Sequence, residues 1–132
     1  MDTIGDTSAR TGDLFDPNCP TRRVLDRIGD KWTVMIVEIL AETSPLRFTD
    51  LRARVRGVTP KVLTQALRAL ERDGLLERQV FAEVPPRVEY SLTAAGISLR
   101  GPLAAIRLWA ETHIGDILAA QGFFDARPKR SR

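Results

Sequence analysis

Four polar residues in the middle of the chain, Lys61, Gln65, Arg68 and Arg72, recur at the spacing of helical turns. At about 100° per residue, their side chains would share one side of a helix and project away from an apolar stripe. Ammonium, amide and guanidinium groups are donors that pair with phosphate oxygens and with the edges of nucleic-acid bases. The same pattern also fits an ordinary helix whose polar side is only solvated. The two interpretations can be distinguished only by the elements next to this helix.

The sequence marks both ends of this helix. Thr59 is a favourable N-cap, Pro60 suits the first helical position, and Gly74 suits the left-handed position after the last turn. The apolar stripe between these ends consists of Leu63, Ala66, Leu67 and Leu70. We therefore predict an amphipathic helix that starts at Pro60 and ends just before Gly74.

A second helix is expected immediately upstream. Thr49 would cap it, and Leu51 and Val55, one turn apart, would pack against the core. Residues 56–58 then form a short glycine-containing turn into the next helix, which is the pattern of a helix-turn-helix. The polar residues that would contact phosphates at the edge of a DNA groove are Thr49, Arg52 and Arg54.

Downstream, residues 75–81 and 87–92 are predicted to be strands, joined by a loop that contains Pro85 and Pro86. In the second strand, the side chains expected to face the core are Val88, Tyr90 and Leu92, and those expected to face outward are Arg87, Glu89 and Ser91. Such a loop is a wing, and Arg87 beside it is placed to meet a phosphate, although a simple edge hairpin is an alternative. The fold class is therefore mainly α with a small β-hairpin, a winged helix-turn-helix, which usually places one helix in the major groove of DNA.

Two scaffold helices precede this unit. Residues 20–28 form a first helix, closed by Gly29, and Asp30 caps a second helix over residues 31–42. The second is expected to be the most buried helix of the chain, through Trp32, Met35, Ile36, Ile39 and Leu40.

Helical segments also follow the hairpin. Thr93 caps a helix from Ala94 that is interrupted at residues 101–102, Gly-Pro, and a final helix runs from Pro102 to about Ala120. Its apolar stripe is long for a chain whose core is already supplied by other helices. We therefore predict N- and C-terminal dimerisation helices, with a dimer interface at Leu103, Ile106, Ala110, Ile114 and Ile117.

Length and charge agree with one small domain. The chain has 132 residues and a formal net charge of +3, and residues 44–100 hold ten Lys and Arg against six Asp and Glu. This basic segment would attract nucleic acid through counterion release. We expect an acidic flexible arm over residues 1–16, the domain over residues 17–120, and a basic tail over residues 121–132. The single cysteine, the polar N-terminus and the absence of a long apolar run predict a cytoplasmic protein with no membrane span.

Three short motifs occur in order: Cys19-Pro20, the run Gly29-Asp30-Lys31-Trp32, and Pro85-Pro86-Arg87-Val88-Glu89-Tyr90. Together they resemble the HxlR-type transcriptional regulators of bacteria, from about Cys19 to Ile117. The resemblance implies a homodimeric repressor or activator that binds an inverted-repeat operator in double-stranded DNA. The helix from Pro60 would then read the major groove. The candidate DNA-binding residues are Thr49, Arg52, Thr59, Lys61, Thr64, Gln65, Arg68 and Arg87.

Cys19 carries a secondary hypothesis. With Pro20 as the first helical residue, the thiol would lie at an N-cap, where the helix dipole, Arg22 and Arg23 favour the reactive thiolate. Several HxlR-type regulators sense reactive species at the matching Cys-Pro position, so the resemblance implies a response to an oxidant, an electrophile or another small effector. The alternative is that Cys19 packs as a small buried apolar residue at the start of the helix, and this alternative is favoured.

Catalysis has little support in the sequence. His113 is the only histidine, and neither a Gly-rich phosphate loop nor a nucleophile elbow is present. We therefore expect no enzyme, no cofactor and no metal site. The main alternative is a winged helix that serves as a protein-interaction module without specific DNA binding, for which an apolar patch would replace the polar helix face. A regulator of the MarR or ArsR type fits the Cys-Pro motif and the short terminal helices less well.

Overall fold

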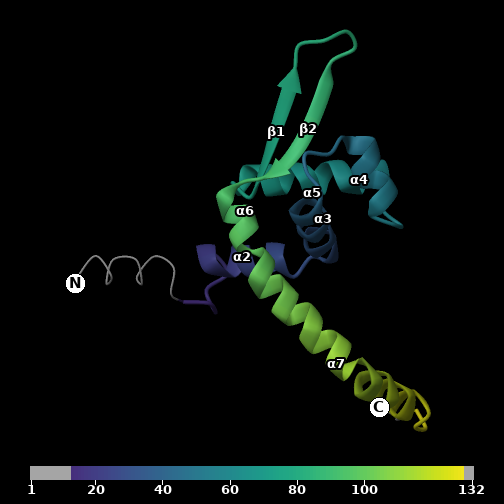
Figure 1. Cartoon of the computed structure of the whole chain (residues 1–132). Coiled ribbons are helices and arrows are strands. Elements are labelled where there is room, and N and C mark those ends of the chain that lie inside the picture. Colours follow the sequence, from purple (N-terminus) through teal and green to yellow (C-terminus); the bar gives the residue numbers. More distant parts are fainter. Residues whose placement is uncertain (1–12, 130–132) are drawn as a thin grey trace. The chain divides into compact units, whose positions relative to one another are not determined.

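The computed structural model describes residues 13–129, and most of this part is helical. The elements in chain order are α2 (Pro20–Ile28), α3 (Lys31–Glu42), α4 (Phe48–Arg54), α5 (Pro60–Arg72), β1 (Leu76–Phe81), β2 (Arg87–Leu92), α6 (Ala94–Ser98) and α7 (Arg100–Asp125) (Figure 1). The chain forms two compact units, one ending at Arg100 and the other beginning at Gly101. The predicted class, mainly α with one small β-hairpin, is confirmed.

The core of the first unit lies where α3, α4 and α5 meet the base of the hairpin. Its buried side chains are Ile36, Leu40, Leu46, Leu51, Val55, Val58, Leu63, Leu67, Leu70 and Leu76. The prediction for α3 is right about Ile36 and Leu40 but wrong about Met35, which is 39% exposed. Thr33 and Val37 are buried as well, so the buried side of α3 is rotated about the helix axis by nearly one residue, roughly 80°, from the predicted stripe.

Helix α4 begins two residues earlier than predicted, at Phe48 instead of Asp50. Arg47 occupies the N-cap position without a capping side-chain hydrogen bond, and Thr49 lies inside the helix, so the prediction that Thr49 caps α4 is wrong. The reason is the residue before Arg47. Leu46 exchanges backbone hydrogen bonds with Tyr90 of β2, at 2.8 and 3.0 Å, and this bridge holds the chain extended up to the start of the helix. Gly57, with a φ of 86°, makes the turn into α5.

Both ends of α5 are as predicted. The Thr59 side chain accepts a hydrogen bond from the Val62 backbone N–H at 3.2 Å, and Pro60 lies at the first helical position. At the other end, Gly74 has a φ of 76°, which is the left-handed conformation that glycine adopts at no steric cost.

We expect Thr59→Ala to lower the free energy of unfolding by about 1 kcal/mol, because the Val62 N–H loses its capping partner. Thr64→Ala is the matched control, since Thr64 is exposed on the same helix and caps nothing, and it should change stability by less than about 0.5 kcal/mol. Urea unfolding at one fixed protein concentration measures both. Equal losses in the two variants would contradict the role of Thr59 as a cap.

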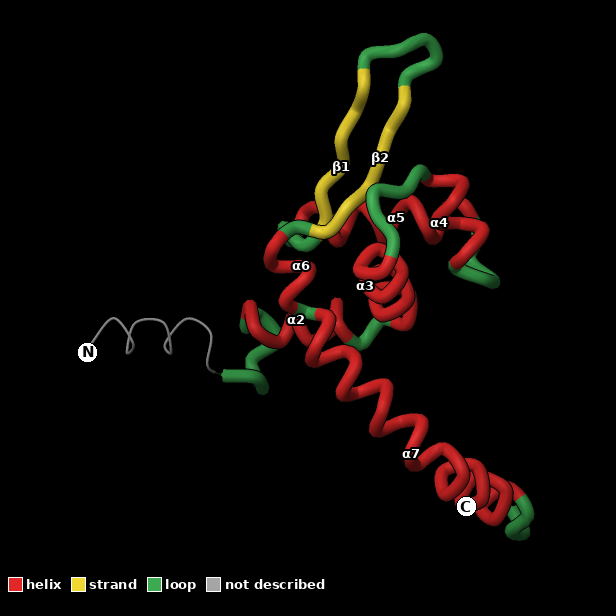
Figure 2. The backbone as a smooth tube through the Cα atoms, viewed as in Figure 1, coloured by secondary structure: helices red, strands yellow, loops and turns green. Residues whose placement is uncertain are grey.

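The two strands form an antiparallel ribbon with a regular register, seen as the yellow pair in Figure 2. Leu76 pairs with Leu92, Arg78 with Tyr90, and Val80 with Val88. Side chains alternate along a strand, so these six share one face of the ribbon, and Glu77, Gln79, Phe81, Arg87, Glu89 and Ser91 share the other. The predicted second strand matches β2. The first strand was predicted to begin at residue 75, but β1 begins one residue later, at Leu76.

Helix α6 packs closely on the turn between α5 and β1. Thr93 caps α6 by accepting from the Gly96 N–H, as predicted, and its hydroxyl also donates to the Gly74 carbonyl at 2.6 Å. The predicted break at residues 101–102 is misplaced, because α6 ends at Ser98 and α7 already includes Gly101 and Pro102. A proline in the first turn of a helix lacks only an N–H that has no intrahelical partner there, so it does not interrupt α7.

Helix α7 is a continuous helix of 26 residues, and its end is later than predicted, at Asp125 instead of about Ala120. Residues 121–125 of the expected basic tail are therefore helical. Of the rest of that tail, the structure describes residues up to 129, and of the expected N-terminal arm it describes only residues 13–16. The remainder of both segments lies outside the described residues.

Candidate nucleic-acid interface

The polar side of α5 is exposed to solvent. Lys61, Thr64, Gln65 and Arg68, all predicted to contact DNA, are exposed, while Leu63, Leu67 and Leu70 on the opposite side are buried. Sequence periodicity is sufficient to divide the helix in this way, because the buried stripe fixes which side remains outward. The exposed set combines an ammonium, a guanidinium, an amide and a hydroxyl, which are the groups that bind phosphates and base edges in DNA.

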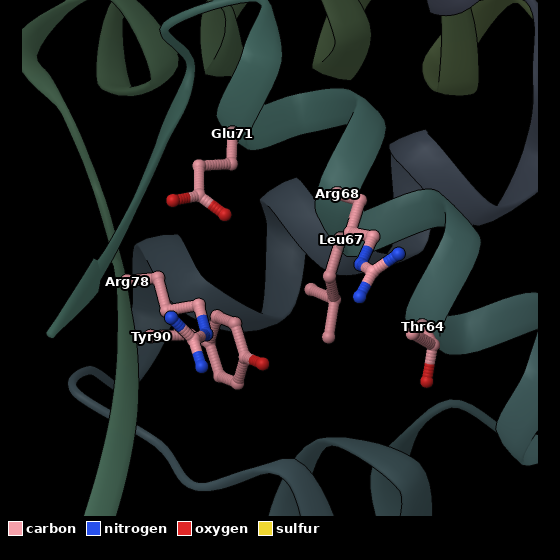
Figure 3. A pocket seen from close by; sticks show the side chains of 6 residues that line it. All are labelled: Thr64, Leu67, Arg68, Glu71, Arg78 and Tyr90. Atoms are coloured by element: carbon pink, nitrogen blue, oxygen red, sulfur yellow. The ribbon is translucent and has the colours of Figure 1, made fainter. Parts of the chain in front are cut away.

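A hollow of about 290 Å³ lies between this helix and the β-ribbon. Figure 3 shows the six residues that line it, four from α5 and two from the strands: Thr64, Leu67, Arg68, Glu71, Arg78 and Tyr90. Leu67 forms the apolar floor, since it belongs to the buried core. Two guanidinium groups and one carboxylate line the hollow, so it retains a net positive charge.

Sequence reasoning missed Arg78 and Glu71 as members of this site. Arg78 lies opposite Tyr90 in the ribbon, on the face that also carries the buried Leu76, and this face packs toward α5. The alternation of the strands contained the necessary signal, because Arg78 is two residues from Leu76 and faces the same way. Glu71 lies one turn beyond Leu67 on α5, which places it at the edge of the same hollow.

Arg87, by contrast, lies on the other face of the ribbon, where two carboxylates and an aromatic ring surround its guanidinium. Its guanidinium approaches the Glu83 carboxylate at 2.7 Å and lies over the Phe81 ring, 4.0 Å from the centroid. Its Nε is 3.1 Å from a Glu89 oxygen without the geometry of a hydrogen bond, so that contact is an ion pair only. The register places Val88, Tyr90 and Leu92 on the face of the buried Leu76, as predicted, and Arg87, Glu89 and Ser91 on the other face. All six residues of β2 are half-buried, and the Arg87 side chain is 27% exposed.

The other residues predicted to contact DNA lie on α4 and at the start of α5. Thr49 and Arg52 line a shallow depression together with Ala53, and all three are exposed. Thr59 is exposed too, but its hydroxyl oxygen already accepts the capping hydrogen bond from Val62. A contact of Thr59 with a phosphate would therefore use the hydroxyl as a donor.

Cys19 occupies the predicted N-cap position of α2, but its thiol makes no capping hydrogen bond there. The residue is only 5% exposed, whereas Arg22 and Arg23 on the first turn are exposed. The Arg22 guanidinium donates to the Phe15 carbonyl at 3.2 Å, which holds it to the segment that precedes the helix. This burial agrees with the alternative that Cys19 packs as a small apolar residue. A reagent could react with the thiol only if the thiol became exposed.

Helix α7 carries the residues that were predicted to form a dimer interface. Leu103 is buried in the single chain, Ile117 is half-buried, and Ile106, Ala110 and Ile114 are exposed. The helix exposes further large apolar side chains at Leu108, Trp109, Leu118, Phe123 and Phe124. His113 stacks on Trp109 with ring centroids 4.5 Å apart, and its Nδ1 lies 2.8 Å from the Trp109 carbonyl oxygen. Both of these contacts of the His113 ring are made within α7.

Residues 13–129 contain neither a cluster of metal ligands nor a helix that could span a membrane. No cluster of three or more His, Cys, Asp or Glu side chains in this part of the chain could hold a metal ion. None of the helices in the same part is both long enough and apolar enough to cross a membrane.

Known proteins are similar to this chain in sequence and in fold. The chain is 42% identical over 112 residues to the HTH-type transcriptional regulator YtfH of Escherichia coli K12, covering 85% of this chain and 88% of the relative. A solved structure described as a transcriptional regulator, YtfH from Salmonella typhimurium, is 41% identical, with a TM-score of 0.75 over 84% of this chain and 98% of that one. The redox regulator HypR in its reduced form is 36% identical, with a TM-score of 0.67 over 76% of this chain and 98% of that one.

The family model for an HxlR-like helix-turn-helix matches residues 27–117, which is more than half of the chain. Its first residue lies in α2 and its last in α7, so the match includes α4, α5 and the whole ribbon with the hollow between them. The chain therefore belongs to the HxlR-like family of winged helix-turn-helix transcriptional regulators.

Proposed function

We propose that this protein is a sequence-specific transcriptional regulator that binds an inverted-repeat operator in double-stranded DNA as a homodimer. The observation that carries the proposal is the exposed polar side of α5, which borders a positively charged hollow shared with the ribbon. In this arrangement α5 enters the major groove, where Gln65 and Arg68 reach base edges, and α4 contacts the backbone through Thr49 and Arg52. A regulator that binds bacterial DNA acts in the cytoplasm, so we place this protein there.

The proposed homodimer is supported by α7. Its exposed apolar side chains, among them Ile106, Ile114 and Phe123, form more apolar surface than a solvated helix of a monomer usually carries. A two-fold pair of helix-turn-helix units reads two half-sites about one DNA turn, or roughly 34 Å, apart. The symmetry of the dimer therefore requires an inverted repeat in the operator.

The first experiment is a binding titration of the purified protein with DNA from the promoter region of its own gene and with unrelated DNA of equal length, at near-physiological salt. We expect a clear preference for the promoter fragment and a stoichiometry of two chains per site. Equal affinity for both fragments would contradict the proposal. It would favour the alternative of a winged helix that serves as a protein-interaction module.

A response to oxidants through Cys19 is a second hypothesis. It is supported by the position of the thiol at the start of α2, by Arg22 and Arg23 beside it, and by the similarity to a protein described as a redox regulator. Because the thiol is only 5% exposed, an oxidant can reach it only when the start of α2 opens.

If Cys19 senses oxidants, diamide should abolish promoter binding, a reductant should restore it, and Cys19→Ser should bind DNA in both conditions. The chain has one cysteine, so the oxidised product would be a disulfide between two subunits or a mixed disulfide with a small thiol. Mass spectrometry distinguishes the two products. Binding by the wild-type protein that is indifferent to diamide would leave Cys19 with a packing role only.

A further inference from the structure

The two arginines of the ribbon differ in what surrounds them. Arg78 on β1 faces the hollow beside α5, and Arg87 on β2 faces the opposite side of the ribbon. Arg87 is held by the carboxylates of Glu83 and Glu89 and by the Phe81 ring. Within the described residues, Arg78 forms no ion pair within 4.0 Å, and its side chain is exposed.

The charges around each arginine lead to different capacities for binding a phosphate. Two carboxylates already compensate the charge of Arg87, so a phosphate would have to displace at least one of them and would meet the repulsion of both. Arg78 shares its hollow with one carboxylate, that of Glu71, and with a second guanidinium, that of Arg68. The hollow therefore attracts an anion, whereas the surroundings of Arg87 do not.

Position leads to the same conclusion. Figure 3 shows the Arg78 guanidinium beside the Tyr90 ring, across the hollow from Arg68 and Thr64 on α5. A DNA backbone that follows the exposed side of α5 would pass over this hollow, between the helix and the ribbon. Tyr90 is the cross-strand partner of Arg78, so both side chains line the same wall of the hollow.

We propose that Arg78, and not Arg87, is the arginine through which the wing binds a DNA phosphate, on the side of the hollow opposite the base-reading Arg68. Arg87 instead holds the end of the ribbon together by pairing with Glu83 and Glu89. This inference rests on the proposed function, and it replaces the expectation from the sequence that Arg87 meets the phosphate.

The test is the salt dependence of DNA binding, because each phosphate contact contributes about 0.9 to the slope of log K against log salt concentration. We expect Arg78→Ala to reduce the slope by about 0.9 on every DNA sequence, which means about a 3.5-fold smaller loss of affinity between roughly 50 and 200 mM salt. Arg78→Lys should restore the slope, since an ammonium also pairs with a phosphate. A merely structural role for the guanidinium would not be rescued in this way.

Two controls separate the alternatives. The double variant Glu83→Ala/Arg87→Ala removes one charge of each sign, and we expect it to keep the slope of the wild-type protein. Arg23→Ala removes one exposed positive charge from α2, outside the hollow, and should keep the slope as well. Circular dichroism confirms that each variant is folded.

An unchanged slope in Arg78→Ala, or a slope that falls by about 0.9 in the double variant, would overturn the inference while leaving the proposed function intact. A wild-type protein that binds no DNA at all would overturn the proposed function itself, and with it this inference.

Discussion

Gly96→Ala is expected to be the most destabilising single substitution that adds only one methyl group to this chain. A Cβ at residue 96 would collide with the Leu75 carbonyl oxygen and would come within 3.1 Å of both the Leu75 carbonyl carbon and Leu92 Cδ2. The backbone oxygen cannot move away easily, because it accepts a hydrogen bond from the Thr93 N–H at 3.2 Å. We expect a loss of about 3 kcal/mol, or about 10 °C in melting temperature at fixed protein concentration.

The control for this prediction is Gly29→Ala, at the end of α2. Gly29 has an ordinary helical backbone, with a φ of −74°, and the nearest atom to an added Cβ is the Leu25 carbonyl oxygen at 3.4 Å. This substitution should change stability by less than about 1 kcal/mol. Thermal unfolding of the two variants side by side provides the comparison. A Gly96→Ala variant as stable as Gly29→Ala would mean that α6 can shift away from Leu75 without loss.

The consequence of Gly96→Ala should extend to DNA binding, because α6 joins directly to β2. Leu92 pairs with Leu76 at the base of the ribbon, and Thr93 bonds to the turn that ends α5. Displacement of α6 would therefore disturb the angle between α5 and the ribbon, and with it the hollow that both elements line. Affinity for DNA at a temperature where the variant is still folded reports this effect separately from stability.

Local signals in the sequence are sufficient to predict the elements of the DNA-binding unit. Capping residues act within one turn of the chain, so Asp30, Thr59 and Thr93 could be identified without any knowledge of the tertiary structure. The start of α4 could not, because it depends on the bridge between Leu46 and Tyr90, which are far apart in sequence. The same limit explains Met35, since the rotation of α3 in the core depends on all its packing partners.

The candidate site could be predicted on α5 but only in part on the ribbon. The apolar stripe of a helix determines which side is exposed, so Gln65 and Arg68 were identified from periodicity alone. On the ribbon, charge and proximity to the loop favoured Arg87, but its pairing with Glu83 and Glu89 depends on the strand register and the loop conformation. Arg78 shares a face of the ribbon with Leu76. That face points toward the candidate site only because the ribbon packs on α5, which the sequence alone does not show.

Arg68→Ala is expected to have the largest effect on sequence discrimination. Arg68 is exposed on α5, one turn from Thr64, and it lines the hollow that faces the ribbon. A guanidinium that donates two hydrogen bonds to one guanine is worth about 1–3 kcal/mol of discrimination against the wrong base. The ratio of affinities for operator and unrelated DNA should therefore fall by roughly 5- to 150-fold.

Arg68→Lys and Arg72→Ala make this prediction specific. The lysine keeps the positive charge but not the planar fork of donors, so affinity for unrelated DNA should persist while discrimination is lost. Arg72 is an exposed arginine one turn further along α5 that does not line the hollow, and its replacement should leave the ratio unchanged. If Arg68→Lys discriminates as well as the wild-type protein, Arg68 contributes charge alone, and base recognition must come from Gln65, Thr64 or Lys61.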